Sequence, residues 1–216
     1  MPRKNVVALD GRPLIAYSIV AALQSGLFDR IVVSTEDAEI AEKAAAAGAE
    51  VFERAPRLAA DMAKVVDVCR DVLEKVAHTE GATPDAFCCL LATAALRTAD
   101  DIVQAYRLLE PGRCNFVMAV TEYSKSPLQA LEVLPDGSLR LMWPELAETP
   151  RWEQPKIVVD NGSTYWCRTE AFLAANTFYG PNLRGYVMPR ERSVDVDTPE
   201  DLELLRYYAA RGHGSN

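Results

Sequence analysis

Two acidic residues near the end of the chain have the type and spacing to do chemistry. Asp195 and Asp197 alternate with Val194 and Val196, which is the two-residue period of a strand. That period puts both carboxylates on one face of the strand, within reach of one small ligand. The next residues, Thr198-Pro199-Glu200-Asp201, predict an immediate helix start, with an N-cap threonine, a proline in the first turn and an aspartate that completes a capping box.

Two carboxylates where a strand turns into a helix are candidate metal ligands. Ligands of open α/β sheets lie beyond the carboxyl ends of the strands. Oxygen ligands without a neighbouring histidine or cysteine suit a hard cation such as Mg²⁺, shared with phosphate groups. For an isolated Asp-x-Asp, the plainer interpretation is a capped helix start with solvated acids. The rest of the chain has to decide between the two.

The composition is that of an ordinary globular protein. The chain has 216 residues, of which 49% are hydrophobic and 25% are charged, enough for one sizeable core. We therefore expect a single domain over residues 1–216 with one appendage. No apolar run approaches the length of a membrane span, and the N-terminus has no signal-peptide pattern, so no membrane partner is expected. The formal charge of −8 argues against nucleic acid as a partner.

Cysteine and histidine usage narrows the chemistry further. The five cysteines form no C-x-x-C pair and no metal-binding spacing; an odd number in apolar surroundings indicates reduced thiols in a cytoplasmic protein. His78 and His213 are the two histidines, and His213 lies in the polar tail 211–216. A histidine-based triad is therefore not expected, and carboxylates or a metal have to carry any ionic chemistry.

The elements that must position the acids alternate between strand and helix. Apolar runs bounded by turn residues predict strands over 30–35, 49–52, 86–93, 115–121, 162–167 and 185–188. Helical spacing and caps predict helices from Pro13 to near Gly26 and over 36–47, 63–78, 98–110 and 169–176. This rhythm predicts an α/β fold with a doubly wound, mostly parallel sheet. The 86–93 run is almost uniformly apolar, as in a central strand.

The rhythm breaks between residues 122 and 160. Short strand candidates over 130–134 and 138–142 flank Pro135-Asp136-Gly137, which is a hairpin signal. A stretch with proline, glutamate and tryptophan follows without a clear period. An insertion of this kind is commonly functional, so we expect residues 122–160 to form a lid or a dimerisation arm.

Several segments, each weak alone, occur in the order typical of one protein family. They are Pro2-Arg-Lys-Asn5, Gly11-Arg-Pro-Leu-Ile-Ala-Tyr-Ser18, Ser25–Thr35, Ala92-Thr-Ala-Ala-Leu-Arg-Thr98 and Val194-Asp-Val-Asp-Thr198. Together they cover nearly the whole chain and resemble the acylneuraminate cytidylyltransferases, or CMP-sialic acid synthetases. The segments Cys88–Ala94, Ser126–Leu131 and Asp160–Trp166 are most similar to the pseudaminic acid cytidylyltransferase branch.

The resemblance implies a fold, a reaction and a metal. The fold is a Rossmann variant of the nucleotide-diphospho-sugar transferase type. The reaction joins CTP to a nonulosonic acid, an acidic nine-carbon sugar such as pseudaminic or sialic acid. The anomeric hydroxyl attacks the α-phosphorus and gives the CMP-sugar and pyrophosphate. Catalysis of this type is mostly positioning and charge neutralisation. Asp195 and Asp197 would hold Mg²⁺ as the cofactor.

The same resemblance assigns residues on the nucleotide side of the site. Lys4 would act with the two acids in catalysis and neutralise phosphate charge, and Asn5 would contact the nucleotide beside it. Arg54 would contact the nucleotide and its phosphates. The alternative for Arg54 is a solvated loop cation.

On the sugar side, the resemblance assigns Gln129, Asp160 and Tyr165 to the sugar pocket. For Gln129 a structural position is equally compatible, and for Tyr165 the alternative is sheet core, since aromatic residues favour strands. Residues 122–160 match an arm that crosses a homodimer and helps to close the partner's site. We therefore expect a homodimer.

Two departures from the family pattern leave questions open. Where sialic acid synthetases carry Gln-Pro-Thr-Ser-Pro, this chain has Leu91-Ala-Thr-Ala-Ala95, so the sugar stays open, the eight-carbon acid of lipopolysaccharide included. Arg97 lies just beyond this stretch, in the family segment Ala92–Thr98. The alternative to a functional role for it is a surface position before a helix.

The second departure is at the start. Family chains begin with a strand and an A-R-x-G-S-K-R loop ahead of P-x-K-N, and the backbone N–H groups of that loop cradle the triphosphate. Because Met1 stands inside this motif, we expect an N-terminally truncated chain that binds CTP weakly. The rival hypothesis is a catalytically impaired relative that acts as a dimeric or sugar-binding protein.

Overall fold

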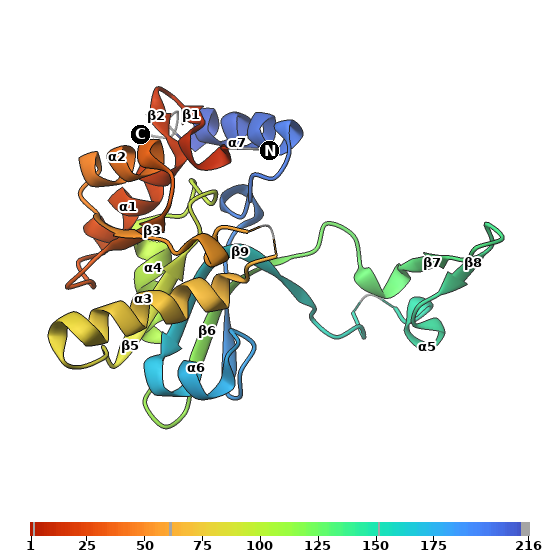
Figure 1. The fold of residues 1–216 in the computed structure, drawn as a ribbon. Helices are drawn as coiled ribbons and strands as arrows, with labels where there is room; N and C mark the ends of the chain where they lie inside the picture. Colours follow the sequence, from red (N-terminus) through yellow and green to blue (C-terminus); the bar gives the residue numbers. More distant parts are fainter. Residues whose placement is uncertain (2, 61, 151, 213–216) are drawn as a thin grey trace.

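The structure, a computed structural model, describes residue 1 and residues 3–60, 62–150 and 152–212. Figure 1 shows a body of strands and helices from which one hairpin region projects. The main sheet of the body has the strand order β10-β6-β9-β5. Its strands are β5 (Ala86–Leu90), β6 (Phe116–Glu122), β9 (Val158–Arg168) and β10 (Leu183–Val187).

Strand β9 sets the character of the sheet. β10 and β6 run parallel, whereas β9 runs antiparallel to both β6 and β5. A separate parallel pair consists of β3 (Val32–Thr35) and β4 (Glu50–Glu53). The predicted α/β class is confirmed. The sheet is mixed because β9 returns from the hairpin region without a crossover helix, which a parallel connection needs.

Strand β5 differs from its prediction as a central strand. It pairs with β9 on one side, and no strand of the described chain pairs with its other edge. All five of its residues are therefore only half-buried. Beyond the strand, the hydroxyl of Ser18 donates a hydrogen bond to the Leu91 carbonyl at 3.1 Å, which satisfies one backbone group that has no ladder partner.

Helices cover both faces of the main sheet, as the doubly wound prediction requires. α3 (Val65–Glu80) and α6 (Thr169–Ala175) pack on one face through a cluster that includes Leu73, Phe116 and Phe172. α1 (Leu14–Ser25) and α4 (Ala99–Arg107) pack on the other through Ala21, Ile102, Val117 and Trp166. α2 (Ala38–Ala46) joins α1 over β3 and β4. Within the described residues, no helix is long and apolar enough to cross a membrane.

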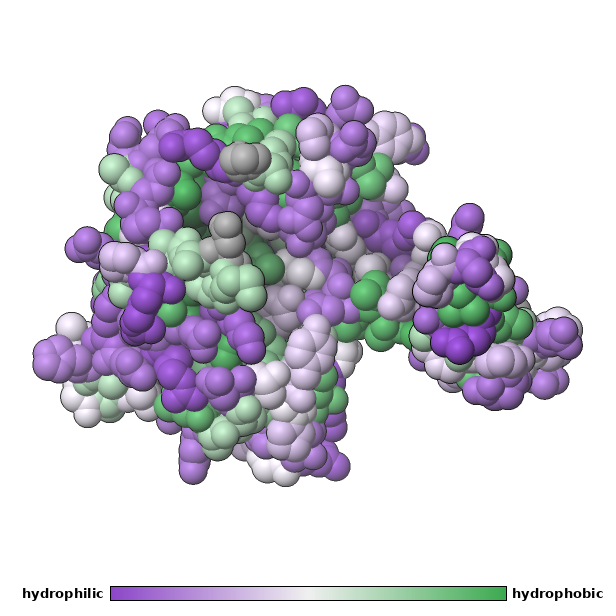
Figure 2. All heavy atoms as spheres, turned by 45° about the vertical axis from the view of Figure 1, so that its right-hand side comes forward, coloured by the Kyte–Doolittle hydropathy of each residue, from purple (hydrophilic) through white to green (hydrophobic). Residues whose placement is uncertain are grey.

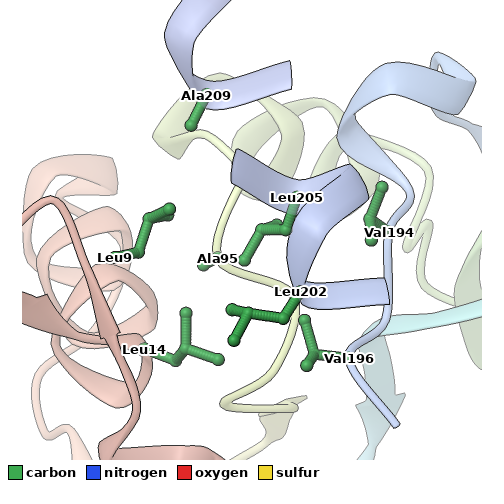
Figure 3. Packing of buried hydrophobic residues seen from close by; sticks show 8 residues of the cluster. All are labelled: Leu9, Leu14, Ala95, Val194, Val196, Leu202, Leu205 and Ala209. Carbon is green, nitrogen blue, oxygen red and sulfur yellow. The ribbon is translucent and has the colours of Figure 1, made fainter. Parts of the chain in front are cut away.

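The two ends of the chain meet in one apolar cluster. α7 (Pro199–Gly212) packs Leu202 and Leu205 against Leu14 and Ala95, and the buried Val194 and Val196 complete the contact (Figure 3). Leu9 enters the same cluster from the short hairpin of β1 (Ala8–Leu9) and β2 (Arg12–Pro13). Burying a side chain of this size stabilises the fold by about 1.5–3 kcal/mol. The cluster fixes the segment that carries Asp195 and Asp197.

We call the hairpin region the arm. It is the part of residues 122–160 that lies between the end of β6 at Glu122 and the start of β9 at Val158. It contains β7 (Leu131–Val133), β8 (Leu139–Leu141), α5 (Pro144–Ala147) and the 3-10 turn η3 (Pro127–Gln129). The predicted hairpin is confirmed around Gly137, which has a positive φ of 82°. At the base of the arm, Lys156 forms an ion pair with Glu122 at 3.1 Å.

The arm exposes several large apolar side chains. Figure 2 shows hydrophobic residues on its surface. The exposed large apolar side chains of the arm are Leu131, Val133, Leu139, Leu141, Met142, Trp143 and Trp152. Among the described residues of the arm, Leu128 is the one buried apolar residue, so the arm has little core of its own.

Candidate functional site

The segment with the two acids is extended but is not a strand. Residues 193–197 follow the 3-10 turn η4 (Arg190–Arg192) and form no sheet ladder, so the predicted strand is wrong. The predicted alternation is nevertheless present, because Val194 and Val196 are buried while Asp195 is half-buried and Asp197 is exposed. The apolar cluster under α7, rather than a neighbouring strand, holds the segment straight.

The predicted start of α7 is confirmed. The helix begins at Pro199. The Thr198 hydroxyl accepts from the backbone N–H of Asp201, whose carboxylate accepts from the Thr198 N–H at 2.8 Å. The same carboxylate oxygen accepts the N–H of Asp197 at 3.1 Å. These reciprocal bonds fix the backbone at the second acid.

Asp195 is enclosed by two other segments. The hydroxyl of Thr93, from the loop after β5, donates to Asp195 Oδ1 at 2.6 Å. The backbone of Gly162, in β9, lies against the other carboxylate oxygen, so that a Cβ placed there would stand 2.7 Å from Asp195 Oδ2. Gly162 also has a positive φ of 65°. A side chain at position 162 is therefore excluded both by strain and by the acid.

Lys4 meets the second acid across almost the whole length of the sequence. Its ammonium group forms an ion pair with Asp197 Oδ1 at 2.5 Å. Lys4 belongs to the 3-10 turn η1 (Lys4–Val6), where Asn5 is half-buried. Three of the predicted site residues, Lys4, Asp195 and Asp197, thus come together in space. The ion pair joins a partly exposed lysine to an exposed acid, so it contributes little to stability.

Arg54 lies at the carboxyl ends of β3 and β4. Its guanidinium donates to the Ser34 carbonyl and comes within 3.5 Å of the Ser34 hydroxyl; Glu36 is 3.8 Å away. It is therefore bonded to the end of β3 rather than free in solvent, and it lines a hollow of about 540 Å³ between β4 and α3. Arg3, next to Lys4, pairs with Asp37 at 3.2 Å, which places η1 near this end of β3.

A second cluster forms around Asp160 in β9. The phenol of Tyr165 donates to both of its oxygens, at 2.9 and 3.0 Å, and the phenol of Tyr179 donates to Oδ2 at 2.7 Å. Burial first, and then the Asp160 charge, raise the pKa of Tyr165. The hydrogen bond to Asp160 first, and then burial, raise the pKa of Tyr179 to about 12. Both phenols are therefore protonated donors at neutral pH.

Tyr165 fits the sheet-core interpretation, and its place in a sugar pocket stays a prediction. Its ring is core, since it is 7% exposed and stacks on Phe178 at 4.6 Å, while its hydroxyl reaches Asp160. Sequence analysis missed Tyr179, which lies 19 residues from Asp160 in a loop without periodicity. The two clusters adjoin, because the Gly162 N–H donates to Asp160 Oδ1 at 2.9 Å while its Cα faces Asp195.

Gln129 and Arg97 complete the predicted residues. Gln129 is exposed in η3, which packs on α5 in the arm; the hydrogen bonds of Asp160 come instead from β9 and Tyr179. Arg97 is 3% exposed, so the surface alternative is wrong. Its guanidinium donates to the Ser163 carbonyl at 2.6 Å, and burial lowers its pKa to about 10.

Comparison with known structures supports the fold. The chain superposes on the CMP:2-keto-3-deoxy-manno-octonic acid synthetase complexed with CTP with a TM-score of 0.69, covering 98% of this chain and 93% of that one at 16% sequence identity. The class defined by the fold is therefore that of the α/β proteins built like this synthetase.

Comparison of sequences gives the family. Residues 1–126 match the family described as Cytidylyltransferase. The pseudaminic acid cytidylyltransferase of Campylobacter jejuni is 34% identical over 100% of this chain and 93% of its own length. The CMP-N,N'-diacetyllegionaminic acid synthase of Legionella pneumophila is 31% identical over 94% of this chain and 88% of its own. The N-acylneuraminate cytidylyltransferase of Escherichia coli is 31% identical over 93% of this chain and 47% of its own. The chain belongs to the cytidylyltransferase family, and the predicted resemblance is confirmed.

Proposed function

We propose that this protein transfers the cytidylyl group of CTP to a nonulosonic acid of the pseudaminic or sialic acid type and releases pyrophosphate. The observation that carries the proposal is the meeting of Lys4 with Asp197, 193 residues apart, beside Asp195. Two acids and a cation at one edge of an α/β fold are suited to bind a nucleotide triphosphate and a divalent cation. Full-length similarity to enzymes named for such sugars supports the choice of substrate.

The residues at the acid pair fit Mg²⁺. Asp195 is half-buried and Asp197 exposed, so both carboxylates are reachable from solvent. The lysine ammonium on Asp197 already marks the place as attractive to a cation. Among the described residues no group of three or more metal-ligating side chains occurs, which suits an ion held by one or two carboxylates and by substrate phosphates. Bound there, Mg²⁺ would neutralise phosphate charge and polarise a phosphoryl oxygen.

The chain's own residues would divide the remaining work. Lys4, with Asn5 beside it, would neutralise the phosphates, and Arg54 would bind the nucleotide from the end of β3. Asp160, with the phenol of Tyr165 directed at it, is placed to orient sugar hydroxyls. Gly162 joins the two clusters, so the anomeric hydroxyl and the α-phosphorus would be held close to each other. Such positioning is the main source of rate in this chemistry.

We further propose that residues 122–160 form a dimerisation arm on the single domain 1–216, and that the protein is a homodimer. The exposed apolar residues of the arm, Val133 and Trp152 above all at 71% and 84%, are of the kind that interfaces bury. Gln129, exposed on the arm, would then reach the sugar pocket of the partner copy. Five free cysteines support a reducing, cytoplasmic location.

A second candidate substrate is the eight-carbon acid of lipopolysaccharide. The likeness of the fold to the CMP:2-keto-3-deoxy-manno-octonic acid synthetase favours it, and Leu91-Ala-Thr-Ala-Ala95, in place of the sialic acid motif, leaves the sugar open. The sugars differ in length and substituents but share the carboxylate and the anomeric hydroxyl, so the reaction at phosphorus is the same.

The test is pyrophosphate release from CTP and Mg²⁺ with each sugar acid in turn. We expect release with pseudaminic acid or a related nine-carbon acid, and much less with the eight-carbon acid. Release with the eight-carbon acid alone would transfer the proposal to the second candidate. Absence of release with every acid, while CTP still binds, would support a non-catalytic relative and contradict the proposed activity.

A further inference from the structure

We propose that Thr93 is a positioning residue that orients the carboxylate of Asp195 toward the divalent cation. The proposal rests on the proposed function, since it concerns the acid assigned there to the metal. Its evidence is a single short hydrogen bond, 2.6 Å from the Thr93 hydroxyl to Asp195 Oδ1. Nothing in the sequence indicated this pair, which is separated by 102 residues.

The burial of Thr93 makes its hydroxyl a fixed donor. Thr93 is 4% exposed, so its side chain is shielded from water. A buried hydroxyl has to find a partner within the protein, and here that partner is an acid at a solvent-accessible site. A hydrogen bond to an ionised acceptor is about twice as strong as one between neutral groups. The hydroxyl therefore holds one particular oxygen of Asp195.

Gly162 restrains the opposite side of the same carboxylate. Because a Cβ at Gly162 would stand 2.7 Å from Asp195 Oδ2, the backbone leaves the carboxylate little room to rotate on that side, and Thr93 holds it on the other. A free aspartate side chain has a broad, roughly two-fold preference for its terminal torsion. The clamp reduces that freedom before any cation arrives, which lowers the ordering cost of binding.

The three segments around Asp195 do not depend on the Thr93 hydroxyl for their arrangement. Arg97 ties the loop after β5 to β9, through hydrogen bonds to the carbonyls of Leu91 at 3.4 Å and Ser163 at 2.6 Å. The amide of Asn161 donates to the Ser193 hydroxyl at 3.0 Å and ties β9 to the acid segment. Loss of the Thr93 hydroxyl should therefore leave the three segments in place and free only the carboxylate.

Residues that orient a metal ligand typically contribute about 10–100-fold to metal affinity. We therefore expect the effect in the coupling between Mg²⁺ and CTP. The measurement is CTP binding by calorimetry, without sugar, once in EDTA and once in excess Mg²⁺. The ratio of the two dissociation constants reports how much the cation contributes, and no turnover is needed.

The informative variants are Thr93→Ala and Thr93→Ser, which differ by one hydroxyl group. We expect Thr93→Ser to keep the wild-type ratio and Thr93→Ala to reduce it by about tenfold, with thermal melting showing that both variants are folded. A Thr93→Ala variant with the wild-type ratio would overturn the proposal and leave a purely structural bond. If Thr93→Ala does not fold, Thr93→Ser is compared with Thr93→Val, which keeps the volume and lacks the hydroxyl.

Asp195→Asn separates this inference from the proposed function. If the metal assignment holds, Asp195→Asn abolishes the Mg²⁺ effect on CTP binding. An Asp195→Asn variant with the wild-type ratio would remove the metal assignment itself. If Asp195→Asn lowers the ratio of the two dissociation constants while Thr93→Ala keeps the wild-type ratio, the metal assignment stands and only the role of Thr93 is removed.

Discussion

The acid site of the body and the arm are built in opposite ways. Asp195 is enclosed by Thr93 and Gly162, and Asp197 is paired with Lys4, so the polar contacts of the site close within one chain. The arm instead presents apolar side chains such as Val133 to solvent. A site of the first kind depends on individual atoms. An apolar surface such as that of the arm is stabilised only when another molecule buries it. Substitutions should therefore affect activity at the acid site and assembly at the arm.

The largest expected effect is at the acid site. Asp197→Asn keeps the shape of the side chain and removes its charge. We expect turnover to fall by about 10²-fold or more, as when one group that stabilises transition-state charge is lost, while the melting temperature stays close to that of the wild type. The matched control is Asp100→Asn, at an exposed position of α4, which should turn over normally. Normal turnover by Asp197→Asn would contradict its assignment.

The next effect concerns the packing beneath the acids. Leu205 is fully buried at 0% exposure, whereas its neighbour Leu204 is 44% exposed. Leu205→Ala should lower the free energy of unfolding by about 2–5 kcal/mol, and Leu204→Ala should change it little. Urea unfolding of both variants measures the difference. Equal stability of the two would show that α7 does not hold the acid segment.

The arm should respond in assembly rather than in stability. Val133→Glu places a charge on an exposed apolar surface, so it should leave the melting temperature of a single chain unchanged and abolish the dimer. Sedimentation of the wild type should give twice the chain mass of 23.8 kDa, and the variant should give 23.8 kDa. Leu204→Glu, outside the arm, is the control. A monomeric wild type would contradict the arm proposal.

The smallest effect lies between the two regions, at Tyr179, which belongs to the body but is 64% exposed. Its pKa is raised to about 12 by the bond to Asp160, so the bond contributes fully below the ordinary tyrosine pKa near 10 and is lost as pH rises through about 12. Alkaline absorbance titration of Tyr179→Phe should lack one phenol that titrates late. The sugar KM should change more than kcat, since the contact orients rather than reacts.

Much of the body could be predicted because its signals are local. Thr198 and Asp201 form a capping box, and Pro135-Asp136-Gly137 forms a hairpin, since each depends on residues a few positions apart. For the extended acid segment, the buried and exposed residues were predicted correctly, but the pairing with a neighbouring strand was not. Alternation of apolar and polar residues indicates which side chains are buried and does not indicate strand pairing. The edge position of β5 also escaped prediction, since an apolar run cannot say how many strands flank it.

The parts of the site that escaped prediction join residues distant in sequence. Thr93 reaches Asp195 over 102 positions and Tyr179 reaches Asp160 over 19, and neither separation carries a periodic signal. Spacing alone made the acid pair a candidate site, but Lys4 was joined to it only because ordered family segments connected the two ends of the chain. For Gln129 the family segments gave a residue assignment that its own chain does not complete. Gln129 lies on the arm, and the hydrogen bonds to Asp160 come from other residues.

Strand β9 places the Asp160 cluster at the base of the arm. The chain leaves the arm, enters β9 at Val158, reaches Asp160 two residues later and Gly162 four residues later, and the Lys156–Glu122 ion pair clasps the junction. The strand thus connects the proposed dimerisation surface directly to the carboxylate proposed to bind the sugar. In the proposed dimer, a second copy that contacts the arm would therefore lie only a few peptide units from the proposed sugar site, and assembly and substrate binding would share the same stretch of backbone.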